Sequence, residues 1–449
     1  MLLYFIAPKR LKNTVLLLAS LFFYGWGEPK FLLFMLLSIT QGYVFGILIE
    51  KYRGQKRSKA FLAVSVIFSL CLLGYCKYAD FFIANFNSVT GLSVPLLKIA
   101  LPIGISFYTF QILSYAVDVY RGETAQKNYI NLAAYIAMFP QLIAGPIVRY
   151  SDIAKQLENR SHSLSDAAVG IRRFVIGLSK KILIANTLGE LVSVFKESDE
   201  KSAAFYWLYA IAYTLHIYFD FSGYSDMAIG LGRVFGFSFS ENFNYPYISA
   251  SITEFWRRWH ISLGSWFRDY LYIPLGGNRV KKVRWLFNIC VVWMATGLWH
   301  GAAWNFVLWG VMFAVILMLE KLWLLKGLQK LKVLNHVYVL LLVIVSFVIF
   351  DSAKISEAFY ALRAMFGGAG LPAVNSLCIY YFKSSAVILI FAAIGATPLP
   401  KKIINKLRTN RTGQLIADYA EPFVLTALLA VCTAFLIDGS FNPFLYFRF

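Results

Sequence analysis

Long apolar segments recur along the whole chain, and most approach the length needed to cross a lipid bilayer. A membrane helix needs about 20 residues for a hydrocarbon core of roughly 30 Å, and the shorter segments require locally thinned bilayer or little tilt. Eleven segments fit this description: Leu11–Trp26, Phe31–Ile49, Ala60–Tyr75, Leu96–Val117, Ile130–Val148, Ala203–Phe219, Trp285–Trp299, Trp304–Trp323, Val337–Phe350, Leu377–Ala396 and Phe423–Ile437. We therefore expect an all-α, polytopic membrane protein with about eleven transmembrane helices.

The composition agrees with this class. Hydrophobic residues make up 59% of the 449 residues and charged residues 15%, whereas soluble proteins carry about 25% charge. The net charge of +20 lies in short clusters between apolar segments, as the positive-inside rule produces, which argues against nucleic acid as a partner. These clusters suit anionic lipid headgroups: Lys9–Lys12, Lys51–Lys59, Arg279–Arg284 and Lys401–Arg411.

The chain opens on seven mostly apolar residues before Pro8, too few to span. This start resembles the end of an incomplete first helix or a half-inserted anchor. With Lys9–Lys12 in the cytoplasm, the next two helices run out and back to the basic loop Lys51–Lys59. No soluble domain, linker or repeat is visible, so we predict a single membrane domain over residues 1–449, with a motif core at about 96–325.

Two segments are too polar to span and too apolar to be free loops. Leu164–Phe195 mixes apolar residues with arginines and lysines, and is typical of an amphipathic interfacial helix. Ser251–Leu275 begins with a sequence that resembles a capping box and continues into an Arg/Trp cluster. Polar backbone at membrane depth is tolerated only where protein or water satisfies it, so we expect interfacial or cavity-lining positions for both segments.

His300 lies in the run Gly297 to Trp304, within otherwise apolar sequence. An imidazole at that depth costs free energy unless it has a partner or a task. Neutral imidazole suits general-base chemistry near pH 7, and Gly297 and Gly301 permit close backbone approach. A histidine that hydrogen-bonds two helices together explains the residue equally well on these grounds.

His260 follows the Arg/Trp cluster. Arg257 and Arg258 suit a phosphate or carboxylate, since guanidinium groups make bidentate contacts. The alternative is a plain interfacial helix with basic flanks, in which Trp256 and Trp259 anchor at the headgroup level. Residue spacing slightly favours this alternative.

His216 lies four residues before Asp220 and so on the same helix face, with Asp226 following. Buried polar residues of this kind usually support the scaffold by pairing, and direct chemistry is the second possibility. We interpret His162 as a solvated loop residue and His336 as interfacial at a helix start.

The five cysteines form no CxxC or Cys/His pattern, so we expect no disulfide and no metal site. Walker, GxSxG, HExxH and Rossmann glycine motifs are absent, which argues against ATP-driven transport and against ordinary hydrolase or zinc chemistry.

Six blocks together resemble the membrane-bound O-acyltransferases (MBOATs), most closely the membrane subunits of alginate O-acetylation. More distant likenesses are to the subunits that D-alanylate teichoic acid or O-acetylate peptidoglycan. The blocks are Tyr218–Asp226, Phe243–Tyr247, Phe255–Leu263, Trp266–Tyr270, Gly297–Trp304 and Asn442–Phe449.

The resemblance implies a ring of tilted helices around a thin centre with a tunnel, and an acetyltransferase that uses His300 as catalytic histidine and His260 as the second. The expected co-substrate is a cytoplasmic acyl thioester, acetyl-CoA, with no permanently bound cofactor. Its acceptor is an extracytoplasmic polysaccharide such as alginate, reached through an SGNH-type acetyltransferase partner or within a synthesis complex at a bacterial inner membrane. Candidates for the donor's phosphates are Arg257, Arg258, Arg268 and Lys281.

Two rival functions remain. A transporter or flippase would move a glycan or acyl carrier without bond making, and is often built on inverted repeats, which this sequence does not show. A scaffold would only recruit an acetylating partner and would tolerate loss of His300.

Overall fold

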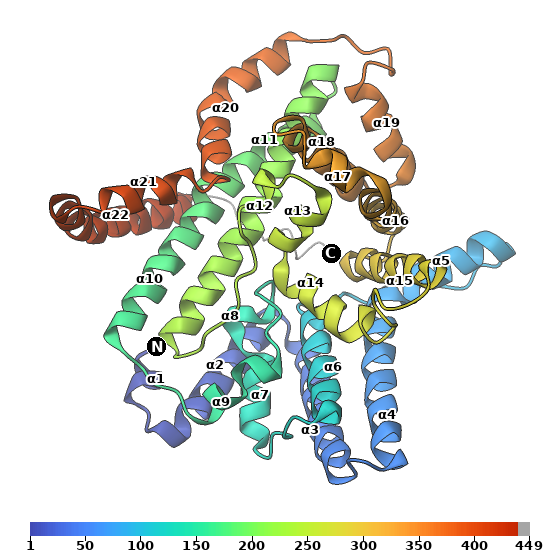
Figure 1. Ribbon diagram of the computed structural model, residues 1–449, viewed down its shortest axis with the longest axis vertical. Coiled ribbons are helices and arrows are strands. Elements are labelled where there is room, and N and C mark those ends of the chain that lie inside the picture. The colour runs from blue at the N-terminus through green and yellow to red at the C-terminus, as the bar shows by residue number, and fades with distance from the viewer. Residues whose placement is uncertain (439–449) are drawn as a thin grey trace. The chain divides into compact units, whose positions relative to one another are not determined.

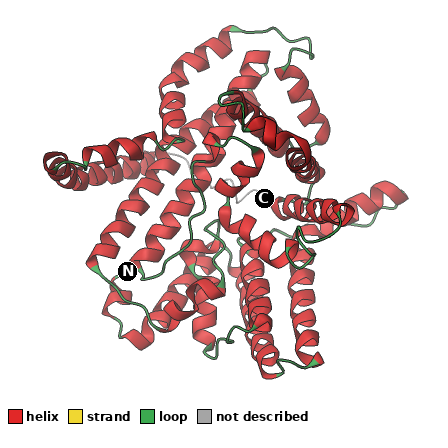
Figure 2. Ribbon diagram, in the orientation of Figure 1, coloured by secondary structure: helices red, strands yellow, loops and turns green. Residues whose placement is uncertain are grey.

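A computed structural model describes residues 1–438, in which helices are joined by turns and loops (Figure 1). Within this range no strand occurs, which confirms the all-α prediction (Figure 2). The terminal block Asn442–Phe449 lies outside the described residues. Contacts divide the chain into two compact units, Met1–Ile171 with Ala228–Ser240, and Arg172–Met227 with Glu241–Phe449. Two of the three boundaries fall within the helices α10 (Leu164–Ser179) and α12 (Ala203–Val234), and the third lies in the loop at Ser240 and Glu241.

The first unit is built mainly from three mutually packed helices, α3, α4 and α6, and from the pair α2 and α7. Its core includes fully buried tyrosines on α6 and α7. Besides parts of α10 and α12, its helices are α1 (Leu2–Ile6), α2 (Lys12–Gly27), α3 (Leu32–Lys51), α4 (Lys56–Leu73), the π-helix η3 (Gly74–Tyr78), α5 (Ala79–Thr90), α6 (Ile105–Arg121), α7 (Tyr129–Ala137), α8 (Phe139–Leu142) and α9 (Tyr150–Glu158).

Two predicted spans are not single continuous helices in this unit. The segment Leu96–Val117 is helical only from Ile105, after Gly104 adopts a left-handed conformation at φ 73°. The segment Ile130–Val148 breaks after Ala137, because Met138 leaves the helical region and Pro140 opens the short α8. Hydrophobicity indicated burial correctly in the second segment, but not one continuous helix.

The second unit carries the predicted site. Its centre is the antiparallel pair α15 and α16, against which α18 packs, with α13 touching α16. After its part of α10 its helices are η4 (Lys180–Ala185, π), α11 (Asn186–Glu197), its part of α12, η5 (Pro246–Ile248), α13 (Ile252–Arg258), α14 (Ile261–Phe267), η6 (Arg268–Tyr272, π), α15 (Lys282–His300), α16 (Trp304–Leu319), η7 (Glu320–Leu324, π), α17 (Leu325–Leu328), α18 (Leu334–Asp351), α19 (Ile355–Met365), α20 (Ser376–Gly395), α21 (Leu399–Leu407) and α22 (Arg411–Asp438).

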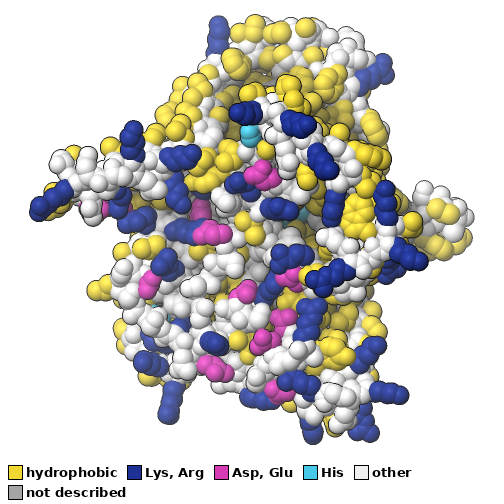
Figure 3. Space-filling view, in the orientation of Figure 1, with side chains coloured by type: hydrophobic (Ala, Val, Ile, Leu, Met, Phe, Trp, Pro, Cys, Tyr) yellow, Lys and Arg dark blue, Asp and Glu magenta, His cyan; other side chains and the backbone are white. Residues whose placement is uncertain are grey.

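Six helical stretches in residues 1–438 are long and apolar enough to cross a membrane. Apolar side chains gather over α18–α20 at the top of Figure 3, as expected of lipid-facing helices. The chain is therefore a multi-pass membrane protein, and the number of eleven spans stays a prediction. The six stretches are Pro29–Lys51, Lys56–Thr90, Trp304–Leu328, Leu334–Asp351, Ser376–Gly395 and Arg411–Asp438.

Candidate active site

His300 is the last residue of α15 and is 6% exposed. Its ring lies edge-on to three aromatic rings, with centroid distances of 5.0 Å to Trp299, 5.1 Å to Trp309 and 5.2 Å to Phe350. Such edge-to-face contacts fix the plane of a ring. The imidazole is thus held in one orientation within an aromatic enclosure, at the point where α15 turns into α16.

A close crossing of two glycines sets this position. A Cβ added to Gly297 would lie 2.3 Å from the carbonyl oxygen of Phe306, and one added to Gly310 would lie 2.4 Å from that of Trp293. Only glycine allows α15 and α16 to approach so closely. The predicted close approach at Gly297 is confirmed, and it places His300 three residues beyond the crossing.

His260 lies between α13 and α14, where the chain changes direction. Its backbone is in the left-handed region at φ 44°, which is uncommon for a residue with a side chain, and the residue is 1% exposed. Ser251 caps α13 by accepting from the Glu254 amide, as the sequence predicted, but the helix ends at Arg258 rather than continuing. The strained turn directs the imidazole inward instead of along an interfacial helix.

The two histidines share one neighbour. The ring of Trp299 lies 5.0 Å from His300 and 5.8 Å from His260, and Phe221 stacks edge-on to His260 at 4.6 Å. Burial, and secondarily the nearby His300, hold the pKa of the His260 imidazole well below its ordinary value. His260 is therefore neutral at physiological pH.

A cavity of about 620 Å³ opens beside His260. Its walls come from α13, α14, η6 and α15 and are mostly apolar. Thr296, one turn before His300, belongs to the wall, as do Trp256 and Trp293. The lining residues are Trp256, Arg257, His260, Ile261, Leu263, Gly264, Ser265, Phe267, Arg268, Tyr272, Ile289, Val292, Trp293 and Thr296.

The four cationic candidates do not gather at one place. Arg257 and Arg268 line the cavity and are exposed. Arg268 also pairs with Asp269 through two hydrogen bonds of 2.6 and 3.0 Å. Arg258 does not line the cavity; it pairs with Glu254 on its own helix and donates to the backbone oxygen of Asn244. Lys281 is exposed and precedes α15 without lining the cavity.

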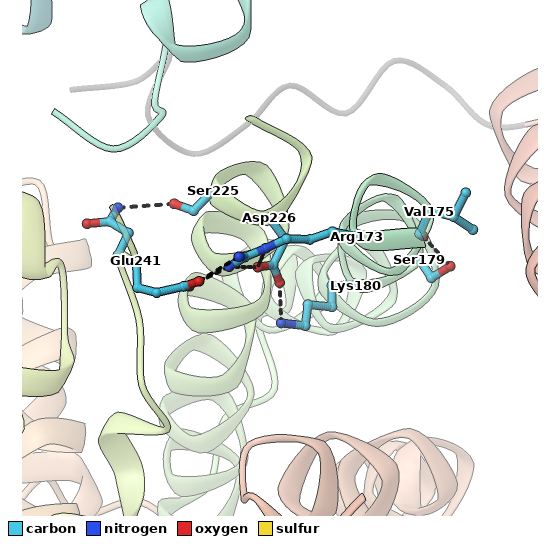
Figure 4. A network of polar contacts seen from close by, with 8 residues as sticks. Arg173, Val175, Ser179, Lys180, Ser225, Asp226 and Glu241 are labelled. Atoms are coloured by element: carbon cyan, nitrogen blue, oxygen red, sulfur yellow. Dashed lines mark hydrogen bonds and ion pairs between the residues drawn. The ribbon is translucent and has the colours of Figure 1, made fainter. Parts of the chain in front are cut away.

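The predicted supporting residues on α12 are held by cations of α10 and η4. Asp226 accepts from Arg173 Nε and Nη2 at 2.9 and 2.8 Å and from Lys180 Nζ at 2.6 Å, and Arg173 also reaches Glu241 (Figure 4). Asp220 pairs with Lys181, and both side chains are almost fully buried. A scaffold role for these two acids stays a prediction.

The other three histidines make polar contacts with residues outside the candidate site. His216 Nδ1 lies 2.5 Å from the carbonyl oxygen of Ala185 rather than bonded to Asp220. His336 Nδ1 lies 3.0 Å from the carbonyl oxygen of Ser249. His162, expected in solvent, is half-buried and its Nε2 lies 2.9 Å from the hydroxyl of Tyr4, so the solvated description is wrong.

Sequence reasoning missed two residues near the site. Asn242 bonds to His260, and Glu320 accepts from the amides of Ile252 and Thr253 at 2.7 and 2.8 Å, which caps α13. Glu320 carried a signal, since it is a lone acid ending an apolar span. The only sequence signal at Asn242 was its position next to the Phe243–Tyr247 block.

The fold and the site together define a class: a helical, multi-pass membrane protein with two buried histidines around one tryptophan, beside a cavity at whose wall lie two arginines. The chain belongs to the membrane-bound O-acyltransferase (MBOAT) family, whose family model matches residues 60–350. It is accordingly an O-acyltransferase, an enzyme that works with an acyl donor as co-substrate.

Full-length relatives support the assignment. The chain is 40% identical to the probable alginate O-acetylase AlgI of Azotobacter vinelandii, with 100% of this chain and 96% of the relative covered. It is 37% identical to the probable alginate O-acetylase AlgI of Pseudomonas putida, with the same coverage. A peptidoglycan O-acetyltransferase of Helicobacter pylori is 30% identical over 99% of this chain and 94% of its own length.

Proposed function

We propose that this enzyme transfers an acetyl group from a cytoplasmic thioester, acetyl-CoA, to a hydroxyl group on the extracytoplasmic side of a bacterial inner membrane. The final acceptor is an exopolysaccharide such as alginate, and an SGNH-type acetyltransferase or the polysaccharide itself supplies the receiving hydroxyl. The names of the relatives, which act on alginate and peptidoglycan, support a polymer acceptor.

The observation that carries the proposal is the pair of buried histidines around Trp299, with His260 on the wall of the cavity. A cavity of this size accommodates a ligand of small-molecule dimensions. Arg257 and Arg268 supply positive charge for the phosphates of the donor.

In the reaction His300 removes the proton of the attacking hydroxyl, and the new C–O ester bond forms as the C–S thioester bond breaks. The proton passes to the departing thiolate, which leaves as the free thiol. In a two-step variant the His300 imidazole first takes the acetyl group and then yields it to the hydroxyl. His260 orients or assists the reacting groups. General-base work of this kind contributes roughly 10²- to 10⁴-fold in rate.

The test uses purified full-length protein with radiolabelled acetyl-CoA, and follows release of the thiol and transfer to an oligosaccharide acceptor. We expect His300→Ala to lower the rate at least about 100-fold while the protein stays folded in the membrane. His336→Gln is the matched control, because that histidine lies on α18 and bonds a backbone oxygen.

The outcomes separate the classes of function. Retained acetylation in His300→Ala would remove this residue from the chemistry and favour the scaffold. A wild-type protein that neither hydrolyses nor transfers the acetyl group, yet moves a glycan across vesicle membranes, would favour the transporter. A His260→Ala variant with wild-type activity would return that residue to a structural role.

A further inference from the structure

Asn242 is a buried residue whose side chain contacts the Nδ1 atom of His260. It is 1% exposed and its side-chain oxygen lies near three donors: Ser262 Oγ at 2.8 Å, the Ser262 amide at 3.2 Å and His260 Nδ1 at 3.1 Å. Its side-chain nitrogen donates to Ser225 Oγ at 3.0 Å. The amide therefore connects α12 to the turn between α13 and α14.

The orientation of the amide follows from one unambiguous donor. A backbone N–H can only donate, so the Asn242 atom that faces the Ser262 amide must be the oxygen. Ser262 Oγ also lies 3.5 Å from His260 Nδ1, but its one hydrogen is donated to the Asn242 oxygen at 2.8 Å. The imidazole nitrogen 3.1 Å from that oxygen then carries its hydrogen, because two acceptors would repel each other. In the neutral ring, Nε2 is left as the basic nitrogen.

A second set of contacts holds Asn242 itself in place. The neighbouring residue Glu241 accepts a hydrogen bond from Arg173 Nη1 at 2.6 Å. The same guanidinium also binds Asp226, which is next to Ser225 in the sequence (Figure 4). Two adjacent connections thus join the same two segments: Ser225 to Asn242, and Asp226 through Arg173 to Glu241.

The backbone adds to this attachment. The carbonyl oxygen of Asn242 accepts from the amide of Ile261 at 2.9 Å, and the amide of Asn244 donates to the carbonyl oxygen of Arg258 at 2.9 Å. These bonds bracket the left-handed turn at His260 on both sides. A strained conformation persists only where its surroundings determine it in this way.

We propose that Asn242 is a positioning residue for acyl transfer, which holds His260 as the Nδ1–H tautomer and makes Nε2 the basic nitrogen of the ring. The proposal rests on the proposed function for its role in acyl transfer. The ion cluster of Arg173, Lys180, Asp226 and Glu241 acts as the outer support of this arrangement. This gives Asp226 an indirect part in the site.

The primary test reads the tautomer directly, independently of activity. Full-length protein labelled with ¹⁵N-histidine in detergent micelles gives nitrogen shifts for each ring, and the His260 signals are those lost in His260→Gln. We expect protonated Nδ1 and bare Nε2 in the wild type at pH 7. In Asn242→Ala the single tautomer should give way to a mixture. A bare Nδ1 in the wild type, or an unchanged ring in Asn242→Ala, would overturn the proposal.

Kinetics supply the second readout. Asn242→Ala should lower kcat about 10- to 100-fold, part of what acid–base groups contribute, with the KM for acetyl-CoA nearly unchanged. The control Asn244→Ala removes an exposed side chain two residues away and keeps the backbone bonds of that residue to Arg258, so it should behave as wild type. Equal losses in both variants, or a loss in KM alone, would count against positioning.

Asn242→Asp separates positioning from mere structural support. A carboxylate still accepts from His260 and Ser262, and Ser225 can donate to it, so activity should be largely rescued. The added negative charge favours the imidazolium and should raise the pKa of His260, which the nitrogen shifts of its ring report across a pH series. A His260 pKa unchanged from the wild type, with activity rescued, would refute the contact to His260.

Other charges around His260 are unchanged in that variant and do not confound the shift. His300 faces it from α15, and two arginines line the same cavity. The acids of α12 are paired with cations of α10 and η4. These groups are His300, Arg257, Arg268 with Asp269, Asp220 with Lys181, and Asp226 and Glu241 with Arg173 and Lys180.

The prediction about the tautomer and the prediction about the activity can be refuted independently. A wild-type protein inert toward acetyl-CoA would refute the proposed function, while the nitrogen shifts would still decide whether Asn242 orients His260. Full acetylation by His260→Gln would overturn the role of Asn242 in the reaction, whatever the tautomer.

Discussion

Substituting Gly297 by alanine tests whether the helix crossing sets the catalytic geometry. The new methyl carbon would lie 2.3 Å from the Phe306 carbonyl oxygen, and ordinary contact begins at 3.4 Å. The obstacle is backbone, which cannot rotate away as a flexible side chain would. Helices α15 and α16 must therefore separate by about 1.1 Å at this point.

The loss of stability and the loss of activity can both be estimated from that displacement. Overpacking of a close contact costs about 1–3 kcal/mol of stability. Misplacement of reacting groups by about 1 Å lowers a rate by about 100-fold. Since His300 follows one turn later, we expect the loss of activity to exceed what the loss of stability explains.

The assay measures acetyl-CoA turnover and the apparent Tm in detergent on the same preparations. Gly327→Ala is the control, because a Cβ there meets nothing within 4 Å. That variant should keep full activity and equal or higher stability, since alanine restricts the unfolded chain.

A double variant sharpens the test. Gly310→Ala clashes with Trp293 across the same crossing, so one separation of the helices relieves both contacts. The losses of stability and activity in the double variant should be clearly smaller than the sums of the losses in the two single variants. Wild-type activity and Tm in Gly297→Ala, or strictly additive losses, would refute the reasoning.

Three further outcomes are expected from the same measurements. Glu320→Gln should lower stability by roughly 1–3 kcal/mol, because it turns an N–H group toward amides at the start of α13, and unchanged stability would deny the cap. Lys181→Met should cost about 3–5 kcal/mol by leaving Asp220 charged and buried, and adding Asp220→Asn should restore most of it, whereas no recovery would contradict the pairing. The pKa of His260 is depressed in the folded protein, so below about pH 6.5 the unfolded chain takes up a proton that the folded protein does not. The contribution of His260 to folding stability is therefore present above about pH 6.5 and is lost as the pH falls below that value. The apparent Tm should therefore fall more steeply toward pH 5 in the wild type than in His260→Asn, and parallel curves would contradict the shift.

The amino-acid sequence by itself determined the class of the protein. Apolar segments of near-bilayer length and clusters of basic residues are local properties, and they predicted an all-α membrane protein without tertiary information. The helix start at Ser251 was likewise readable, since a cap involves residues three positions apart. The same local reasoning failed at Leu96–Val117 and Ile130–Val148, because hydrophobicity does not report backbone conformation.

Tertiary structure alone decided the arrangement of the candidate site. His260 and His300 are forty positions apart and meet around Trp299 because of the left-handed turn before α14 and the glycine crossing at Gly297. The tertiary structure also showed that Arg257 and Arg268 line the cavity whereas Arg258 does not. The spacing of these residues in the sequence could not predict that difference. The physical reason is that side-chain contacts between distant segments depend on how helices pack and where they break, and neither is encoded in the periodicity of any one segment.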